Sequence, residues 1–198
     1  MSRELTPEER ANKLLSSIAK IIGLGNEEKD ILRRLEYYRN AETLAREALH
    51  LNPNSAKAHW RLADIILGIT GNEFRLDEGL EEITYHLDES ERLALEYKEV
   101  AEERRRIYLH YLMEGAKDAL KISGKKNNCL AKKYSETALR ANGETAEAHY
   151  LVALAEYKIS GEKQARFINF HLWKAEKLDS SYKEKTKELR IKLRKNDQ

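Results

Sequence analysis

Cysteine, proline and glycine are all scarce in this chain of 198 residues, which has one, two and nine of them. A single cysteine, Cys129, excludes an internal disulfide and a cysteine-rich zinc site, so we expect it to be a partly buried helix residue without a role. No apolar run approaches the roughly 18 residues that a membrane-spanning helix needs. The first residues, MSRELTPEERANK, are too charged for a signal peptide. We therefore expect a soluble, cytoplasmic protein without a membrane span.

Charge is abundant and unevenly placed. Charged residues make up 35% of the chain and hydrophobic residues 41%, a balance that suits helices with a buried apolar face and a charged outer face. Acids dominate residues 73–103, whereas residues 104–140 and the tail 183–195 are basic. Runs of this kind attract phosphates or acidic partners in some proteins, but they are more often simple solvated faces.

The chain also repeats itself. Residues 40–71, NAETLAREALHLNPNSAKAHWRLADIILGITG, return about ninety residues later as residues 130–161, LAKKYSETALRANGETAEAHYLVALAEYKISG. The identities in register are Ala41 with Ala131, Ala48 with Ala138, Leu49 with Leu139, Asn52 with Asn142, Ala56 with Ala146, Ala58 with Ala148, His59 with His149, Ala63 with Ala153, Ile69 with Ile159 and Gly71 with Gly161. Such a duplication indicates a repeat architecture.

Helical spacing of apolar residues predicts an all-α fold without strands. The expected helices cover residues 7–22, 27–51, 55–70, 72–87, 90–122, 128–141, 145–160, 163–178 and 181–195. Four helix ends, at Asn52, Asp88, Asn142 and Asp179, mark the close of four helix-turn-helix units. We expect a single domain over 1–198, with halves at about 1–90 and 91–180, and with 181–198 as a capping helix and basic tail.

The first copy resembles two consecutive helices of the tetratricopeptide repeat family. Its small and proline places hold Ala41, Ala45, Ala48 and Pro53, and its Trp, Leu, Gly and Tyr places hold His59, Leu62, Ala63 and Ile66. The second copy is similar at Ala131, Ser135, Ala138, His149, Val152 and Ala153, and departs at Gly143 and Glu156. The resemblance implies a right-handed α-solenoid of about four such units, closed by the capping helix.

Nothing in the chain predicts catalysis. It has no HExxH spacing, no glycine-rich phosphate loop, no serine elbow and no Cys-His arrangement. We expect His59 and His149 to be packed side chains rather than metal ligands. The sequence therefore predicts no enzyme, no cofactor and no metal.

The resemblance implies a scaffold or adaptor that binds a peptide or helix of another protein in a concave groove. The groove positions, by the match to the motif, are Lys57, Trp60, Arg61, Asp64, Leu67, Glu147, Tyr150, Leu151, Leu154 and Tyr157. Trp60 and Tyr150 are the best candidate anchors, because large rings supply apolar contact at low entropic cost. The alternative is that both rings pack against the neighbouring hairpin.

Two other functions stay open and rank lower. Nucleic acid, RNA in particular, would bind basic helix faces beside interleaved tyrosines, at Arg104, Arg105, Arg106, Lys132, Lys133, Tyr108, Tyr111, Tyr134 and the basic tail. A homo-oligomer would form if the acidic segment of one copy met the basic segment of another.

Overall fold

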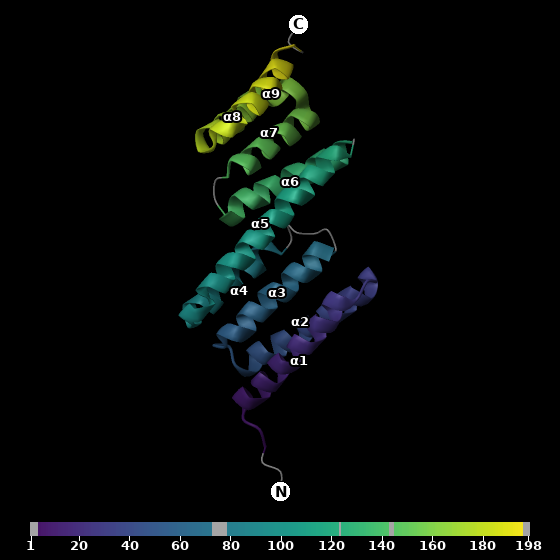
Figure 1. The fold of residues 1–198 in the computed structure, drawn as a ribbon, viewed down its shortest axis with the longest axis vertical. Helices are drawn as coiled ribbons and strands as arrows, with labels where there is room; N and C mark the ends of the chain where they lie inside the picture. The colour runs from purple at the N-terminus through teal and green to yellow at the C-terminus, as the bar shows by residue number, and fades with distance from the viewer. Residues whose placement is uncertain (1–3, 73–78, 123, 143–144, 196–198) are drawn as a thin grey trace. The chain divides into compact units, whose positions relative to one another are not determined.

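The computed structural model describes residues 4–72, 79–122, 124–142 and 145–195. Every regular element within these ranges is an α-helix or a short 3-10 helix, and none of the described residues lies in a strand (Figure 1). The prediction of an all-α chain is therefore confirmed. Gly143, where the second copy departs from the repeat motif, lies outside the described residues.

Nine α-helices lie within the described ranges. They are α1 (Pro7–Glu27), α2 (Ile31–Leu51), α3 (Ala56–Asn72), α4 (Leu80–Leu93), α5 (Lys98–Lys121), α6 (Lys125–Asn142), α7 (Ala146–Ser160), α8 (Ala165–Leu178) and α9 (Lys183–Lys195). The 3-10 helices are η1 (Leu95–Tyr97), η2 (Gly161–Gln164) and η3 (Ser180–Tyr182).

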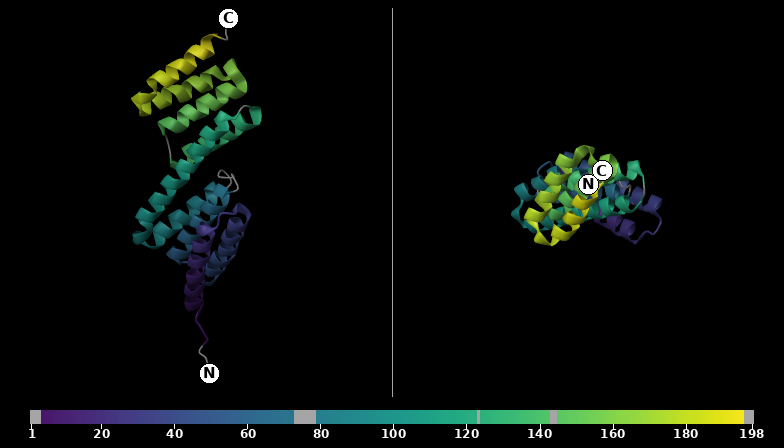
Figure 2. Two further views of the ribbon diagram at one scale, coloured as in Figure 1. Left: turned by 45° about the vertical axis from the view of Figure 1, so that its right-hand side comes forward. Right: turned by 90° about the horizontal axis from the view of Figure 1, so that it is seen from above.

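The chain divides into two compact units, residues 1–106 and 107–198. The division falls within α5, whereas the sequence suggested a boundary near residue 90. In the first unit α1 packs on α2, α2 on α3 and α3 on α4. In the second unit α6 packs on α7, α7 on α8 and α8 on α9. The left view of Figure 2 also shows neighbouring helices of each unit side by side.

The first helix begins where the sequence predicts and ends later. Thr6 caps it: the Thr6 hydroxyl accepts from the Glu9 amide at 3.2 Å, and the Glu9 carboxylate accepts from the Thr6 amide at 2.8 Å. The helix then continues through Gly23 and Gly25 to Glu27, so the prediction of an end at residue 22 was wrong. A helical glycine costs only about 1 kcal/mol, which the packing of α1 on α2 outweighs.

The fourth and fifth helices meet later in the sequence than predicted. α4 continues to Leu93, Ala94 is extended with φ −151° and ψ 116°, and α5 begins at Lys98 after η1. The single helix expected from Ser90 is therefore interrupted, because apolar spacing does not reveal one extended residue. Asp179 has nearly the same backbone, φ −148° and ψ 113°, between α8 and η3.

Small residues form the helix contacts that the duplication predicts. The alanines at the small places are fully buried, namely Ala41, Ala45, Ala48, Ala131 and Ala138. Short side chains let antiparallel helices approach closely, and leucine and isoleucine fill the remaining space. In the first unit the large buried side chains are Leu15, Ile18, Leu62, Ile65, Ile83 and Leu87. In the second unit Ile168 and Leu172 of α8 share a cluster with Leu189 and Leu193 of α9.

Candidate partner-binding surface

The groove positions of the first copy lie on α3 and are partly covered by the chain that follows α4. The rings of Trp60 and Tyr97 are 6.0 Å apart between centroids. The guanidinium carbon of Arg61 lies 4.2 Å from the centre of the Trp60 ring. The structure thus brings Trp60 and Arg61 together, and η1 packs against them.

Asp64 is engaged by two arginines. Its carboxylate lies 2.9 Å from Nε of Arg104 and 4.0 Å from the Arg61 guanidinium. Burial raises the pKa of the Asp64 carboxyl, although both arginines oppose that shift. Burial also lowers the pKa of Arg61. The Asp64 charge is therefore met by Arg104 within the first unit, whereas the buried Nε of Arg61 has no hydrogen-bond partner among the described residues.

The groove positions of the second copy meet η3 and α9. The rings of Tyr150 and Tyr182 are 5.6 Å apart between centroids. Tyr150, Leu154 and Tyr157 of α7 are half-buried against the cluster of α8 and α9 described above. The segment η3–α9 therefore covers much of the face that the sequence assigned to a partner.

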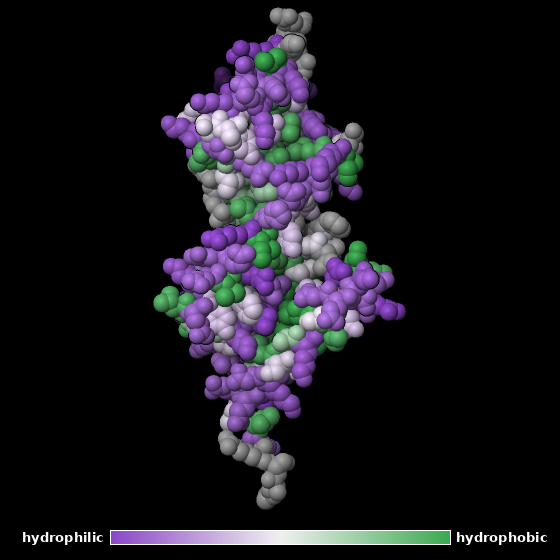
Figure 3. All heavy atoms as spheres, in the orientation of Figure 1, coloured by the Kyte–Doolittle hydropathy of each residue, from purple (hydrophilic) through white to green (hydrophobic). Residues whose placement is uncertain are grey.

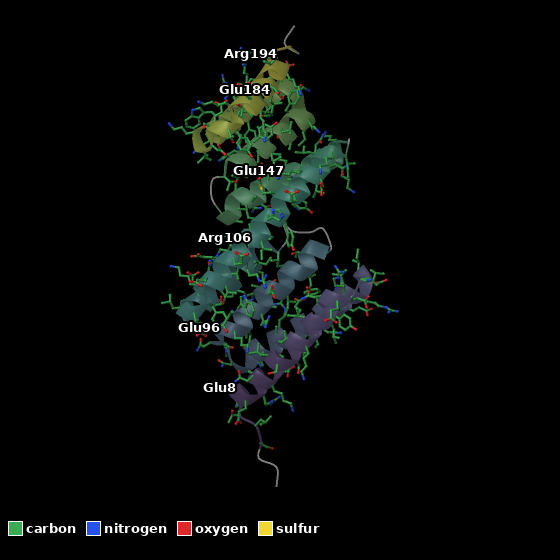
Figure 4. All side chains as sticks on the ribbon, viewed as in Figure 1. Glu8, Glu96, Arg106, Glu147, Glu184 and Arg194 are labelled. Atoms are coloured by element: carbon green, nitrogen blue, oxygen red, sulfur yellow. The ribbon has the colours of Figure 1, made fainter. Side chains whose placement is uncertain are left out.

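The remaining groove positions differ in their surroundings. Leu67 and Leu151 are each 4% exposed and pack inside their units, so they offer little surface to a partner. Glu147, which is labelled in Figure 4, lies in the first turn of α7. Its carboxylate forms an ion pair with Lys117 at 2.7 Å. Lys57 is exposed.

The basic triplet proposed for nucleic acid is used inside the first unit. Arg104 pairs with Asp64 as described, and Arg105 lies 2.6 Å from Asp88 and 3.1 Å from Glu91. Arg106 approaches Glu103 at 3.8 Å. These cations are already paired with acids, which weakens the case for a phosphate-binding face at α5.

The tyrosines interleaved with the basic residues are mostly unavailable for base stacking. Tyr108 and Tyr134 are each 2% exposed, while Tyr111 is exposed. Lys132, a further member of that set, pairs with the buried Glu156 at 2.7 Å. The acidic segment of the oligomer alternative is described only in part, since residues 73–78 lie outside the described ranges.

A different surface is exposed on the second helix of the later hairpin. Most of the face drawn in Figure 3 is hydrophilic, with smaller hydrophobic patches in both units. On α8 the exposed residues Arg166, Phe170, Trp173 and Lys177 follow one another at spacings of four, three and four, so they share one face of the helix. We call these four residues the α8 stripe. Both of its rings are 50% exposed.

The two rings of the α8 stripe lie together. Their centroids are 6.4 Å apart, and Nζ of Lys174 is 5.8 Å from the centre of the Phe170 ring and 5.9 Å from that of Trp173. The opposite face of α8 is anchored by Ile168 and Leu172, which are fully buried. The stripe is therefore held on a packed helix and faces away from the core.

Sequence reasoning missed the α8 stripe, because the tetratricopeptide motif directs attention to the first helix of each hairpin. The signal was present in the segment RFINFHLWKAEK. Once Ile168, Leu172 and Ala175 are assigned to the core, Phe170 and Trp173 fall on the other side of a helix. Two aromatic residues at non-core positions could have predicted this surface.

The first unit has a surface at the matching positions with a different composition. The exposed residues Glu81, Tyr85, Asp88 and Arg92 of α4 each lie 85 positions before a member of the α8 stripe. We call them the α4 stripe. Tyr85, at the place of Phe170, is 55% exposed. The place of Trp173 is occupied by Asp88, whose carboxylate is paired with Arg105. The α4 stripe therefore lacks the two adjacent apolar rings that the α8 stripe carries.

Each unit also contains a buried pair of histidines that joins two helices. Nδ1 of His59 lies 2.8 Å from Nδ1 of His86, and Nδ1 of His149 lies 2.7 Å from Nδ1 of His171. The angles between the ring planes are 40° and 42°. All four side chains are at most 8% exposed. The duplication therefore extends to a specific side-chain contact.

The hydrogen bonds assign the protons of the first pair. Nε2 of His59 is 3.0 Å from the carbonyl oxygen of Pro53, which only accepts, so this nitrogen carries a proton. In a neutral ring Nδ1 of His59 then accepts, and Nδ1 of His86 donates to it. Burial, and then the neighbouring His59, lowers the pKa of His86 to about 4. Burial and His149 likewise lower the pKa of His171 to about 4.

Other features that bear on function are few. Cys129 is exposed on α6, so the expectation of a partly buried thiol was wrong. Among the described residues, no group of three or more His, Cys, Asp or Glu side chains is placed to hold a metal ion. Within the same residues no helix combines the length and the apolar character that crossing a membrane requires.

Comparison with known proteins gives no assignment. The chain matches no protein-family model and no curated protein.

Proposed function

We propose that this chain is a non-enzymatic protein-binding module, a scaffold or adaptor built from helix hairpins of the tetratricopeptide type. Its binding surface is the α8 stripe. The observation that carries the proposal is the pair of adjacent, half-exposed rings of Phe170 and Trp173 on an otherwise charged helix face. Large apolar side chains grouped on the surface of a soluble domain mark interaction sites.

The size of the two rings supports this role. Covering about 100 Å² of apolar surface on each of the two rings contributes about 5 kcal/mol in total, at about 25 cal/mol per Å². The translational and rotational entropy lost on association is subtracted from this value. Tryptophan and phenylalanine also lose little side-chain entropy on binding, since each has only two rotatable side-chain bonds. A partner that covers both rings gains enough binding free energy to form a specific complex, provided that its polar side chains around the rings complement those of this chain.

The groove positions on α3 and α7 rank second. Trp60 and Tyr150 are half-buried against Tyr97 and Tyr182, so a partner would gain less by covering them. Their polar neighbours Arg61 and Asp64 are engaged with each other or with Arg104. These contacts favour the α8 stripe over the groove as the principal surface.

Affinity capture with matched variants tests the proposal. The tagged protein, Phe170→Ser/Trp173→Ser and Tyr85→Ser are incubated with an extract of the cells that produce the protein, with and without nuclease. Tyr85→Ser is the control because Tyr85 has the same exposed position on α4. We expect a defined protein to be retained by the original chain and by Tyr85→Ser, and to be lost from the double variant.

Circular dichroism shows whether each variant is folded. Retention that survives Phe170→Ser/Trp173→Ser would contradict the assignment of the surface. Capture of nuclease-sensitive material alone would contradict the proposed function itself.

A further inference from the structure

The ends of the α8 stripe are positively charged. Arg166 lies one turn before Phe170, and Lys177 lies one turn after Trp173. Neither cation forms an ion pair with any residue in the described part of the chain, and both are exposed. The apolar pair is therefore flanked along the helix by two cations that the fold leaves available.

The helix that packs on the buried face of α8 is also basic. α9 packs on α8, and residues 183–194 contain six basic and two acidic side chains. Figure 4 labels Glu184 and Arg194 near the two ends of α9. Lys174, next to the stripe, places its ammonium group over both rings. Lys174 and the two cations of the stripe thus attract negative charge to Phe170 and Trp173.

The fold does not require a cation at the place of Arg166. On α4 the place of Arg166 is occupied by Glu81, and the place of Trp173 by Asp88. Both helices nevertheless bury matching core residues, Ile83 with Ile168 and Leu87 with Leu172. Since the same packing accommodates Glu81 on α4, the positive charge of Arg166 is not needed for folding, whereas the place of Lys177 holds a cation, Arg92, on α4 as well.

We propose that the α8 stripe binds an acidic amphipathic helix of another protein. Apolar side chains of that helix cover Phe170 and Trp173, and its carboxylates pair with Arg166 and Lys177. Eleven residues at 1.5 Å per residue separate the two cations by about 16 Å, so the two acidic sites of the partner helix lie about three turns apart. This inference rests on the proposed function and adds the chemistry of the partner.

Charge favours such a helix over the α4 stripe of a second copy of this chain. The α4 stripe offers Glu81 and Asp88, but it also carries Arg92, and Asp88 is already paired with Arg105 at 2.6 Å. The carboxylates of an external acidic helix do not meet this obstacle.

A selection experiment tests the proposal. A display library of random 16-residue peptides is selected separately on the full chain, on Arg166→Glu/Lys177→Glu, and on Phe170→Ser/Trp173→Ser. We expect peptides from the full chain to combine apolar residues at helical spacing with Asp or Glu on both sides. The charge-reversed protein is expected to lose this acidic preference.

Affinities then measure the contribution of the charges. Fluorescence anisotropy of one selected peptide is expected to show binding weakened about tenfold or more by Arg166→Glu/Lys177→Glu, and weaker binding in high salt. The control Lys13→Glu/Lys20→Glu changes two exposed lysines of α1 and alters the net charge equally. It is expected to bind the peptide within about twofold of the original chain, because screened charges outside the contact contribute little.

The outcomes separate this inference from the proposed function. Selected peptides that need the rings but show no acidic preference would overturn the partner chemistry and leave a protein-binding module. Peptides that bind both double variants as tightly as the full chain would show that the α8 stripe is not the binding surface. A dT20 oligonucleotide that binds the full chain more tightly than any selected peptide, and loses affinity in Phe170→Ser/Trp173→Ser, would replace the helix with nucleic acid.

Discussion

At the scale of single residues, the two histidine pairs show how far the duplicated halves correspond. His59 and His149 are 90 positions apart, whereas His86 and His171 are 85 apart. The difference of five residues falls in the connection between the first and second helix of each hairpin. The equivalent contacts are nevertheless 2.8 Å and 2.7 Å long. The pairing therefore constrains how each second helix docks on its first.

Acid is expected to destabilise both pairs. An unfolded histidine has a pKa of about 6.5, whereas those of His86 and His171 are about 4, so the unfolded chain binds more protons between these values. The free energy of unfolding therefore falls as the pH is lowered from 6.5 towards 4. Between pH 7 and pH 5 each pair should lose about 2 kcal/mol.

Urea unfolding at pH 7 and pH 5 measures this loss. The variant His86→Asn/His171→Asn keeps a polar side chain but removes both groups with lowered pKa. We expect the difference in unfolding free energy between the two pH values to be smaller in the variant. An equal difference in the two proteins would show that other groups cause the acid sensitivity.

A second residue-scale contact is the close approach of α2 to Gly68. A Cβ atom at this position would lie 2.8 Å from Cζ and 2.9 Å from Cδ1 of the Tyr38 ring. The phenolic oxygen of Tyr38 also donates to Oδ1 of Asn26 at 2.7 Å, which holds the ring in place. We expect Gly68→Ala to destabilise the protein by about 1–3 kcal/mol through overpacking.

Gly23→Ala is the matched control for this prediction. Gly23 is also helical, and nothing lies within 4 Å of a Cβ atom added there. Alanine is about 0.5–1 kcal/mol more favourable than glycine in a helix, so we expect no loss of stability or a small gain. Thermal unfolding of the two variants measures both effects, and equal destabilisation would contradict the packing described for Gly68.

At the scale of elements, α9 repeats the role of the first part of α5. Arg105 of α5 pairs with Glu91 of α4 at 3.1 Å, and 85 residues later Arg190 of α9 pairs with Glu176 of α8 at 2.5 Å. In each unit the helix that follows the hairpin also brings a tyrosine to the groove positions, Tyr97 and Tyr182. The groove face is thus covered by the same kind of element in both units.

Packing of α9 on α8 is expected to contribute substantially to the stability of the second unit. Leu189 is 3% exposed within the cluster of Ile168 and Leu172, while Ile191, two residues on, is 45% exposed. We expect Leu189→Ala to lower the free energy of unfolding by about 2–4 kcal/mol, and Ile191→Ala by less than about 1 kcal/mol. Denaturant unfolding of the two variants measures this, and similar losses would argue against a docked α9.

At the scale of the whole molecule, the sequence predicted the helices and the duplication better than the surfaces. Helical spacing, the Thr6 cap and the glycines gave an all-α chain with most helices in place. The extended residue Ala94 was not predicted, because a single backbone bend leaves the apolar period nearly unchanged. The helix end at Asp179 was predicted correctly.

The candidate site was harder to predict for a physical reason. Whether Trp60 is free depends on a contact with Tyr97, which lies 37 positions away and belongs to an element that the sequence placed inside a longer helix. Exposure at Phe170 and Trp173 follows from what α8 buries, which a motif for the first helix of a hairpin does not describe. The spacing of apolar residues thus predicted the helices, whereas the exposure of each aromatic ring depends on how the helices pack on one another.

The central claim is that a partner covers the α8 stripe, and the two tryptophans of the chain allow a direct measurement. Trp173 belongs to the stripe and Trp60 to the groove positions. Trp60→Phe leaves Trp173 as the only indole reporter, and Trp173→Phe leaves Trp60. Emission and acrylamide quenching are then recorded with and without a selected peptide that lacks tryptophan.

We predict that the peptide shifts the emission of Trp173 to shorter wavelength and reduces its quenching, while the signal of Trp60 stays unchanged. Reduced quenching of Trp60 together with an unchanged signal of Trp173 would contradict this claim. It would show that the peptide binds the groove positions instead of the α8 stripe.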